Sequence, residues 1–81
     1  MKLLFTTKAR KDYEALNSRL QSLVDKQLDA LLRDIRYPSL KAKKYHENDD
    51  IWQARVDRDY RFYFRIEGDA YVILTIIKHP K

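Results

Sequence analysis

Residues 52–66 read WQARVDRDYRFYFRI, and this stretch decides the fold of the chain. Large apolar residues alternate with polar ones at a period of two, which is typical of a β-hairpin with one buried and one exposed face. The exposed side, here called the arginine face, carries Arg55, Arg61 and Arg65. Because like charges on neighbouring strands destabilise a sheet, this face predicts an anionic ligand, either a phosphate backbone or an acidic partner.

The loop of this hairpin sets its register. A three-residue loop at 57–59 places Arg55 opposite Arg61 and keeps the aromatic residues together on the other face. A two-residue loop would pair apolar Val56 with Arg61 and mix the two faces, so we reject it. The sequence therefore predicts two arginines side by side on neighbouring strands.

The turn around residues 67–69 leaves two registers open for the last strand. A three-residue loop there would place Thr75, Ile77 and His79 on the arginine face, and a two-residue loop would place them on the core face. The last strand is apolar on both faces, so its pattern does not choose between them.

Helical spacing of apolar residues predicts two helices before the hairpin. The first covers residues 8–16 after a threonine cap at position 6 or 7. Ser18 and Gln21 form a capping box for the second helix, which ends before Pro38. Residues 39–45 are expected to be a basic connector. The predicted strands cover residues 2–6, 52–56, 60–66 and 70–78.

The composition describes one small domain, residues 1–81, with a net charge of +5 that favours anionic partners. The chain has no cysteine, so disulfides and thiolate metal sites are impossible, which suits a reducing compartment. The spacing of His, Asp and Glu residues offers no set of metal ligands, and we predict no metal and no cofactor. The apolar start ends at Phe5, too early for a signal peptide, and no stretch could span a bilayer. We therefore expect a cytoplasmic protein.

Three motifs follow one another along the chain: PSLKAKK at 38–44, WQARVDRDYR at 52–61 and YVIL at 71–74, with His79 behind them. Together with the order of elements, they resemble the RelE/ParE superfamily of bacterial and archaeal type II toxins. The resemblance covers nearly the whole chain. It implies an α+β fold of order β-α-α-β-β-β, in which a helical hairpin packs on one face of a curved antiparallel sheet.

The resemblance also implies a function. RelE-type members bind messenger RNA on the ribosome and cleave it without a metal, leaving a 2′,3′-cyclic phosphate and a 5′-hydroxyl. ParE-type members share the fold but inhibit DNA gyrase and are not nucleases. An antitoxin protein neutralises both kinds. We predict an endoribonuclease toxin whose partners are mRNA, the ribosome and an antitoxin. A gyrase inhibitor and an inactive toxin-fold binding protein are the alternatives.

Site residues are carried over one at a time. The family's active-site arginine falls on Arg61, which would stabilise the charged phosphorane. Arg55 falls on a basic residue that activates the 2′-hydroxyl or holds the phosphate. His79 falls on the group that protonates the leaving 5′-oxygen, a step that histidine performs near neutral pH. The predicted RNA-binding residues are Lys41, Lys43, Lys44, Gln53, Tyr63, Arg65 and Lys81.

Overall fold

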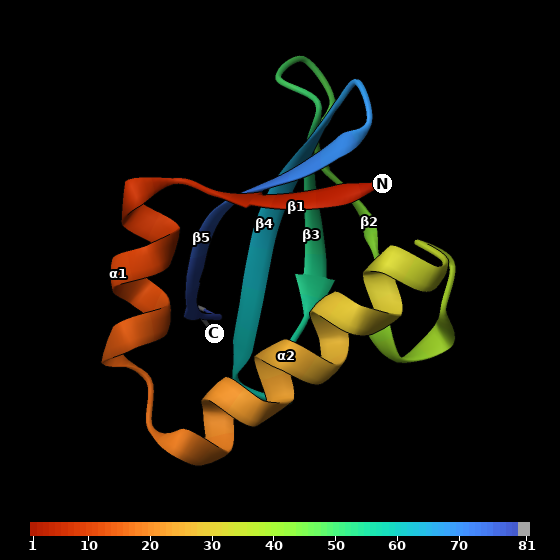
Figure 1. Ribbon diagram of the computed structural model, residues 1–81. Coiled ribbons are helices and arrows are strands. Elements are labelled where there is room, and N and C mark those ends of the chain that lie inside the picture. The colour runs from red at the N-terminus through yellow and green to blue at the C-terminus, as the bar shows by residue number, and fades with distance from the viewer. Residues whose placement is uncertain (80–81) are drawn as a thin grey trace.

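The computed structural model describes residues 1–79, which form two α-helices and a five-stranded sheet (Figure 1). In chain order the elements are β1 (Lys2–Phe5), α1 (Thr7–Ala15), α2 (Ser18–Arg33), the 3-10 helix η1 (Pro38–Leu40), β2 (Lys43–His46), β3 (Ile51–Arg55), β4 (Tyr60–Glu67) and β5 (Ala70–Lys78). The helices and the sheet form an α+β fold with α2 crossing one face of the sheet (Figure 1).

The strands lie in the order β1-β5-β4-β3-β2. β3, β4 and β5 match the three predicted strands to within one residue at each end. The α+β class is confirmed, but the sheet is mixed, because β1 pairs with β5 in parallel. A parallel neighbour needs a long connection, and all of residues 6–69 lie between these two strands.

Side-chain caps fix where both helices begin. The hydroxyl oxygen of Thr6 accepts the N–H of Ala9 (3.0 Å), which confirms the predicted cap of α1. The expected capping box at Ser18 is wrong, because Asn17 occupies the cap position of α2. The Oδ1 of Asn17 accepts the N–H of Leu20 at 2.9 Å. The cap therefore lies one residue earlier in the chain than predicted. Asparagine is at least as good an N-cap as serine, so the helix starts at the first cap available.

The second helix ends at Arg33, several residues before Pro38. Asp34 leaves the helical conformation, and its carboxylate accepts the N–H of Arg36 at 2.9 Å. This local bond stabilises a turn in place of a further helical turn. Pro38 then starts η1 and does not itself end α2. No helix within residues 1–79 is long and apolar enough to cross a membrane.

The hydrophobic core lies between the helices and the sheet. Val24 and Leu31 of α2 are fully buried against Phe62, Phe64 and Ile73 of β4 and β5. Burial of each of these side chains contributes about 1.5–3 kcal/mol to folding. The periodicity that predicted the core face of the hairpin is therefore confirmed.

The first helix covers the edge of β5 that β1 leaves free (Figure 1). The carboxylate of Asp12 accepts the hydroxyl of Thr75 at 2.6 Å and the N–H of Ile76 at 3.0 Å. A third bond comes from the ammonium group of Lys8 at 3.1 Å. The polar groups at this sheet edge are thus paired with a helix side chain and not left exposed.

The hairpin register is confirmed. Arg55 lies opposite Arg61, and the core-facing residues oppose one another on the other face. The N–H of Val56 donates to the carbonyl of Tyr60 at 3.0 Å, which closes the three-residue loop.

The second turn has the two-residue loop of one predicted register, but the end of β5 faces the side that the other register predicted. Glu67 pairs with Ala70, so the loop has two residues, with Gly68 at φ +58° in its first position. This is the place where a type II′ turn needs glycine. A β-bulge then shifts the pairing of β5 by one residue and sets Thr75 opposite Tyr63 and Ile77 opposite Arg61. The end of β5 therefore returns to the arginine face.

The connector expected at 39–45 instead contains η1 and an edge strand, β2. Lys43 pairs with Gln53 of β3, and a bulge follows at Tyr45. All four residues of β2 are exposed, so no alternation of burial marks it in the sequence. Such short, charged strands are common at sheet edges, where they discourage pairing with other chains.

Candidate nucleic-acid interface

Arg55 and Arg61 form the centre of the arginine face. They are direct cross-strand partners, and both side chains donate to the main-chain carbonyl of Asp57, Arg55 through Nε (3.3 Å) and Arg61 through Nη1 (2.6 Å). Arg61 Nη1 also donates to the carbonyl of Tyr60 at 2.9 Å. Within residues 1–79 these bonds leave Nη1 and Nη2 of Arg55, and Nε and Nη2 of Arg61, without a hydrogen-bond partner. Those nitrogens can donate to an anion.

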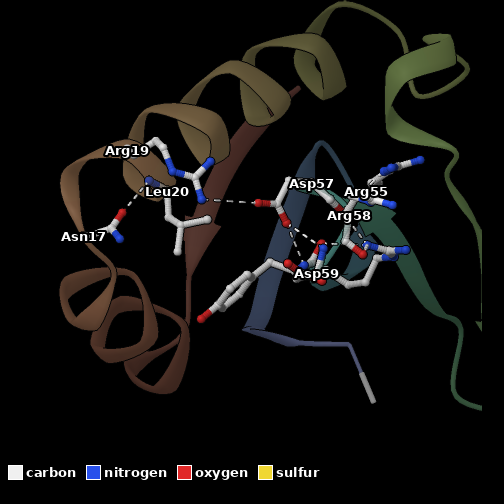
Figure 2. Close-up of polar contacts among 9 residues, drawn as sticks. Asn17, Arg19, Leu20, Arg55, Asp57, Arg58 and Asp59 are labelled. Atoms are coloured by element: carbon white, nitrogen blue, oxygen red, sulfur yellow. Dashed lines mark hydrogen bonds and ion pairs between the residues drawn. The ribbon is translucent and has the colours of Figure 1, made fainter. Parts of the chain in front are cut away.

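The carboxylate of Asp57 shapes the loop beneath the arginines. It accepts the N–H groups of Asp59 and Tyr60, both at 2.8 Å. Its other oxygen lies 3.9 Å from Arg19, which extends from the start of α2. Figure 2 shows Arg19 on one side of Asp57, with Arg55 and Arg58 on the other. This acid therefore pairs with a helix residue and not with the cations of the arginine face.

A pocket of about 540 Å³ opens at this loop, lined by Arg55, Arg58, Asp59 and Arg61. Three positive groups and one carboxylate surround it. Neither Arg55 nor Arg61 forms an ion pair with a carboxylate of residues 1–79; Asp57 pairs with Arg19, and Glu67 pairs with Arg65. A pocket with this charge favours an anion such as phosphate.

His79 lies beside the same loop. Its N–H donates to the carbonyl of Asp59, and it follows Ile77, the partner of Arg61, by two residues. The imidazole is half-buried, and its Nδ1 has no hydrogen-bond partner within the described part of the chain. The structure therefore brings His79 to the rim of the arginine pair, although it does not line the pocket itself.

Gln53 and Tyr63 do not present the contact surface that was predicted. Both face the arginine side of the sheet, but they are only 6% and 7% exposed, and Gln53 donates its Nε2 to the hydroxyl of Tyr63 at 2.9 Å. The ring of Tyr45 covers Tyr63, with ring centroids 5.0 Å apart. Tyr45 is 59% exposed and is the aromatic side chain available on this face, a role that the sequence did not reveal because β2 was not foreseen.

The predicted lysines separate in space. Lys43 shares the face of Gln53, whereas Lys44 lies opposite Trp52 on the other face, so the two do not form one track. Lys44 bonds Asp50 at 2.6 Å, and this bond raises the pKa of Lys44 and lowers that of Asp50. Neighbouring side chains of a strand point to opposite faces of the sheet. The prediction of a connector at 39–45 did not include this alternation.

Arg65 and Lys41, which were also predicted to bind RNA, do not line this pocket. Arg65 shares the face but sits near Glu67 at 3.9 Å. Lys41 lies at the end of η1 in a left-handed conformation, φ 45°. Lys81 falls outside the described residues. Within residues 1–79 no three His, Cys, Asp or Glu side chains gather closely enough to hold a metal ion.

Sequence reasoning missed Gln27, which the fold places directly behind Arg55. This buried side chain donates Nε2 to the carbonyls of Arg55 (2.7 Å) and Ser39 (2.9 Å) and accepts the hydroxyl of Ser39 at 3.1 Å. A glutamine within the apolar stripe of α2 was the available signal, because buried polar groups are almost always bonded.

Comparison with solved structures defines the class of this fold. The YoeB/ParE toxin from Agrobacterium tumefaciens superposes with a TM-score of 0.84 at 20% identity, covering 99% of this chain and 100% of that one. The YoeB dimer from Staphylococcus aureus gives 0.81 at 15% identity, with coverage of 100% and 98%. The RelBE2 toxin–antitoxin complex from Mycobacterium tuberculosis gives 0.72 at 26% identity, with 96% of each chain covered. The fold is that of the RelE/ParE type II toxins.

The sequence identifies the family within this class. Residues 3–81 match the model of the ParE toxin of the type II toxin–antitoxin system parDE. The chain therefore belongs to the ParE toxin family and is a toxin of a type II toxin–antitoxin system. No protein of curated function matches its sequence.

Proposed function

We propose that this toxin is an endoribonuclease that cleaves mRNA on the ribosome in the cytoplasm and so arrests translation. The observation that carries the proposal is the pair Arg55 and Arg61, which line one solvent pocket and form no ion pair with a carboxylate of residues 1–79. Such a pair is suited to a phosphate that gains charge during a reaction.

The proposed reaction needs no group beyond the RNA, the protein and solvent water. The 2′-oxygen attacks the adjacent phosphorus while its proton passes to a water molecule, the P–O5′ bond breaks, and the 5′-oxygen takes up a proton. The products are a 2′,3′-cyclic phosphate and a 5′-hydroxyl. Arg61 and Arg55 would hold the phosphorane oxygens and favour loss of the 2′-proton. His79 at the rim would supply the proton to the 5′-oxygen.

An antitoxin is the proposed protein partner. Structures similar to this chain include the toxin–antitoxin complexes RelBE2 from M. tuberculosis and RelB–RelE from Methanococcus jannaschii. The net charge of +5 favours an acidic segment in such a partner. An open reading frame next to the toxin gene is the expected source.

Inhibition of DNA gyrase is the second candidate, since the family model that matches residues 3–81 is that of ParE. Induced expression separates the two candidates. The ribonuclease predicts new mRNA 5′ ends within coding regions, while chromosomal DNA stays intact. Gyrase inhibition predicts DNA breaks and an SOS response, while mRNA stays intact. Expression of Arg61→Ala beside the wild type shows which effect depends on the arginine pair.

A further inference from the structure

A second cationic pocket lies on the other side of Arg55. It has a volume of about 310 Å³ and opens between α2, η1 and the end of β3. Arg55 lines this pocket and also the pocket of the arginine face, so the two meet at one residue. The lining residues are Leu23, Lys26, Gln27, Ser39, Lys41, Arg55 and Val56.

The charges of this second pocket are not compensated. Lys26 and Lys41 are exposed, and neither forms an ion pair with a carboxylate of residues 1–79. By contrast, Lys8 and Lys44 each have an aspartate partner. Positive groups that share a concave surface without acids raise the local concentration of anions.

The walls of the pocket are fixed in advance. Gln27 is 5% exposed and bonds the carbonyls of Ser39 and Arg55, which ties α2 to both neighbouring walls. Lys41 is held at φ 45°, a left-handed conformation that lysine rarely adopts and that is kept where the surroundings impose it. The cations therefore converge without a rearrangement of the backbone, which lowers the cost of binding.

We propose that this pocket binds a second phosphate of a single-stranded RNA, next to the phosphate held by Arg55 and Arg61. The inference rests on the proposed function and adds a direction to it: the strand crosses Arg55 toward α2. The other direction, along β4 toward Arg65, is less favourable. There Arg65 lies 3.9 Å from Glu67, and this carboxylate offsets its charge.

Binding of non-cleavable 2′-O-methyl RNA at several salt concentrations tests this path. For a single strand, each lost phosphate contact decreases the magnitude of the slope of log affinity against log salt concentration by about 0.7. The double variant Lys26→Ala/Lys41→Ala should lose about 0.7 of the slope with a hexanucleotide, and each single variant should lose part of it. Dinucleotide binding should be unchanged. Lys11→Ala removes an exposed lysine of α1 and is the matched control, with no change in slope expected.

Three results would overturn the inference. If Lys26→Ala and Lys11→Ala show the same salt dependence of affinity while the wild type binds normally, the second pocket does not bind RNA. The proposed function is unaffected by that result. A larger loss for Arg65→Ala than for Lys26→Ala places the strand along β4. If the wild-type protein binds neither oligonucleotide, this inference fails, while cleavage of ribosome-bound mRNA tests the proposed function separately.

Discussion

Arg55 and Arg61 lie directly opposite each other on β3 and β4, and both donate to the same main-chain carbonyl, that of Asp57. Two like charges in this arrangement repel each other, and a shared neutral acceptor offsets part of the repulsion. Both terminal nitrogens of Arg55, and Nε and Nη2 of Arg61, stay available to an anion. The loop therefore holds the pair in place with donors left over for a ligand.

Loss of Arg61 should abolish most of the proposed activity. Arg61→Ala removes a donor that would stabilise the phosphorane, and the cleavage rate should fall about 10²–10³-fold. Arg61→Lys restores the charge but not the fork of donors, so it should recover the rate only in part. Rates on ribosome-bound mRNA measure both variants. Arg10→Ala, an exposed arginine of α1, is the control, and wild-type cleavage by Arg61→Ala would remove this residue from the mechanism.

Asp57 should influence activity without contacting RNA. Asp57→Ala deletes two bonds to the loop backbone, which should cost about 1–3 kcal/mol of stability and loosen the carbonyl that positions both arginines. We expect slower cleavage by this variant, even though the loss of a negative charge would by itself favour binding of the anionic RNA. Arg19→Ala breaks only the exposed ion pair with Asp57 at 3.9 Å and should change the stability by less than about 1 kcal/mol. Equal cleavage by Asp57→Ala and the wild type would show that the loop does not position the pair.

Gln27 should be the most costly polar residue of α2 to replace. Gln27→Leu leaves the carbonyls of Ser39 and Arg55 without this partner in a buried site, and the free energy of unfolding should fall by about 2–3 kcal/mol. Gln21→Leu is the matched control, because Gln21 donates to a single carbonyl, that of Tyr13. Denaturant unfolding measures both variants, and a smaller loss for Gln27→Leu than for Gln21→Leu would contradict the structure.

Acid should weaken the contact between α1 and β5. Burial opposes ionisation of Asp12, but hydrogen bonds from Thr75, Ile76 and Lys8 outweigh it and hold the pKa of this carboxyl below its ordinary value of 3.8. Since the folded-state pKa is the lower one, the ionised carboxylate stabilises the fold above about pH 3.8. This contribution is lost as the pH falls through the folded-state value.

The unfolding free energy, measured from neutral pH to about pH 2, tests this assignment. Asp12→Asn should be less stable than the wild type at neutral pH and should lose less stability in acid. Asp29→Asn is the control, because that carboxylate is exposed on α2 and, among residues 1–79, pairs only with Arg33. The same acid dependence in the wild type and in Asp12→Asn would contradict the assignment.

The hairpin could be predicted in detail because one face is buried and the other is not. A slip of one residue would have moved Arg61 into the core, so the pattern allowed one register. The last strand lacks this contrast, and its bulge, which brings Ile77 opposite Arg61, could not be predicted from the sequence. The edge strand β2 is exposed throughout and left no pattern either.

The candidate site was predicted in part for the same reason. Alternation placed Arg55, Arg61 and Tyr63 on one face, and the structure agrees. The cover over Tyr63 comes from Tyr45, on the strand that was not foreseen. The position of Gln27 behind Arg55 depends on a contact between segments far apart in the chain, and a local sequence pattern does not predict such a contact.

The end groups of cleaved RNA test the central claim most directly. Wild-type toxin is incubated with a defined mRNA, free and bound to ribosomes, and with the same mRNA carrying a 2′-deoxynucleotide at the cut site. We predict fragments with a 2′,3′-cyclic phosphate and a 5′-hydroxyl, and no cut at the deoxynucleotide. Intact mRNA in both settings, or a cut that persists without the 2′-hydroxyl, would contradict the assignment of the arginine face to RNA cleavage.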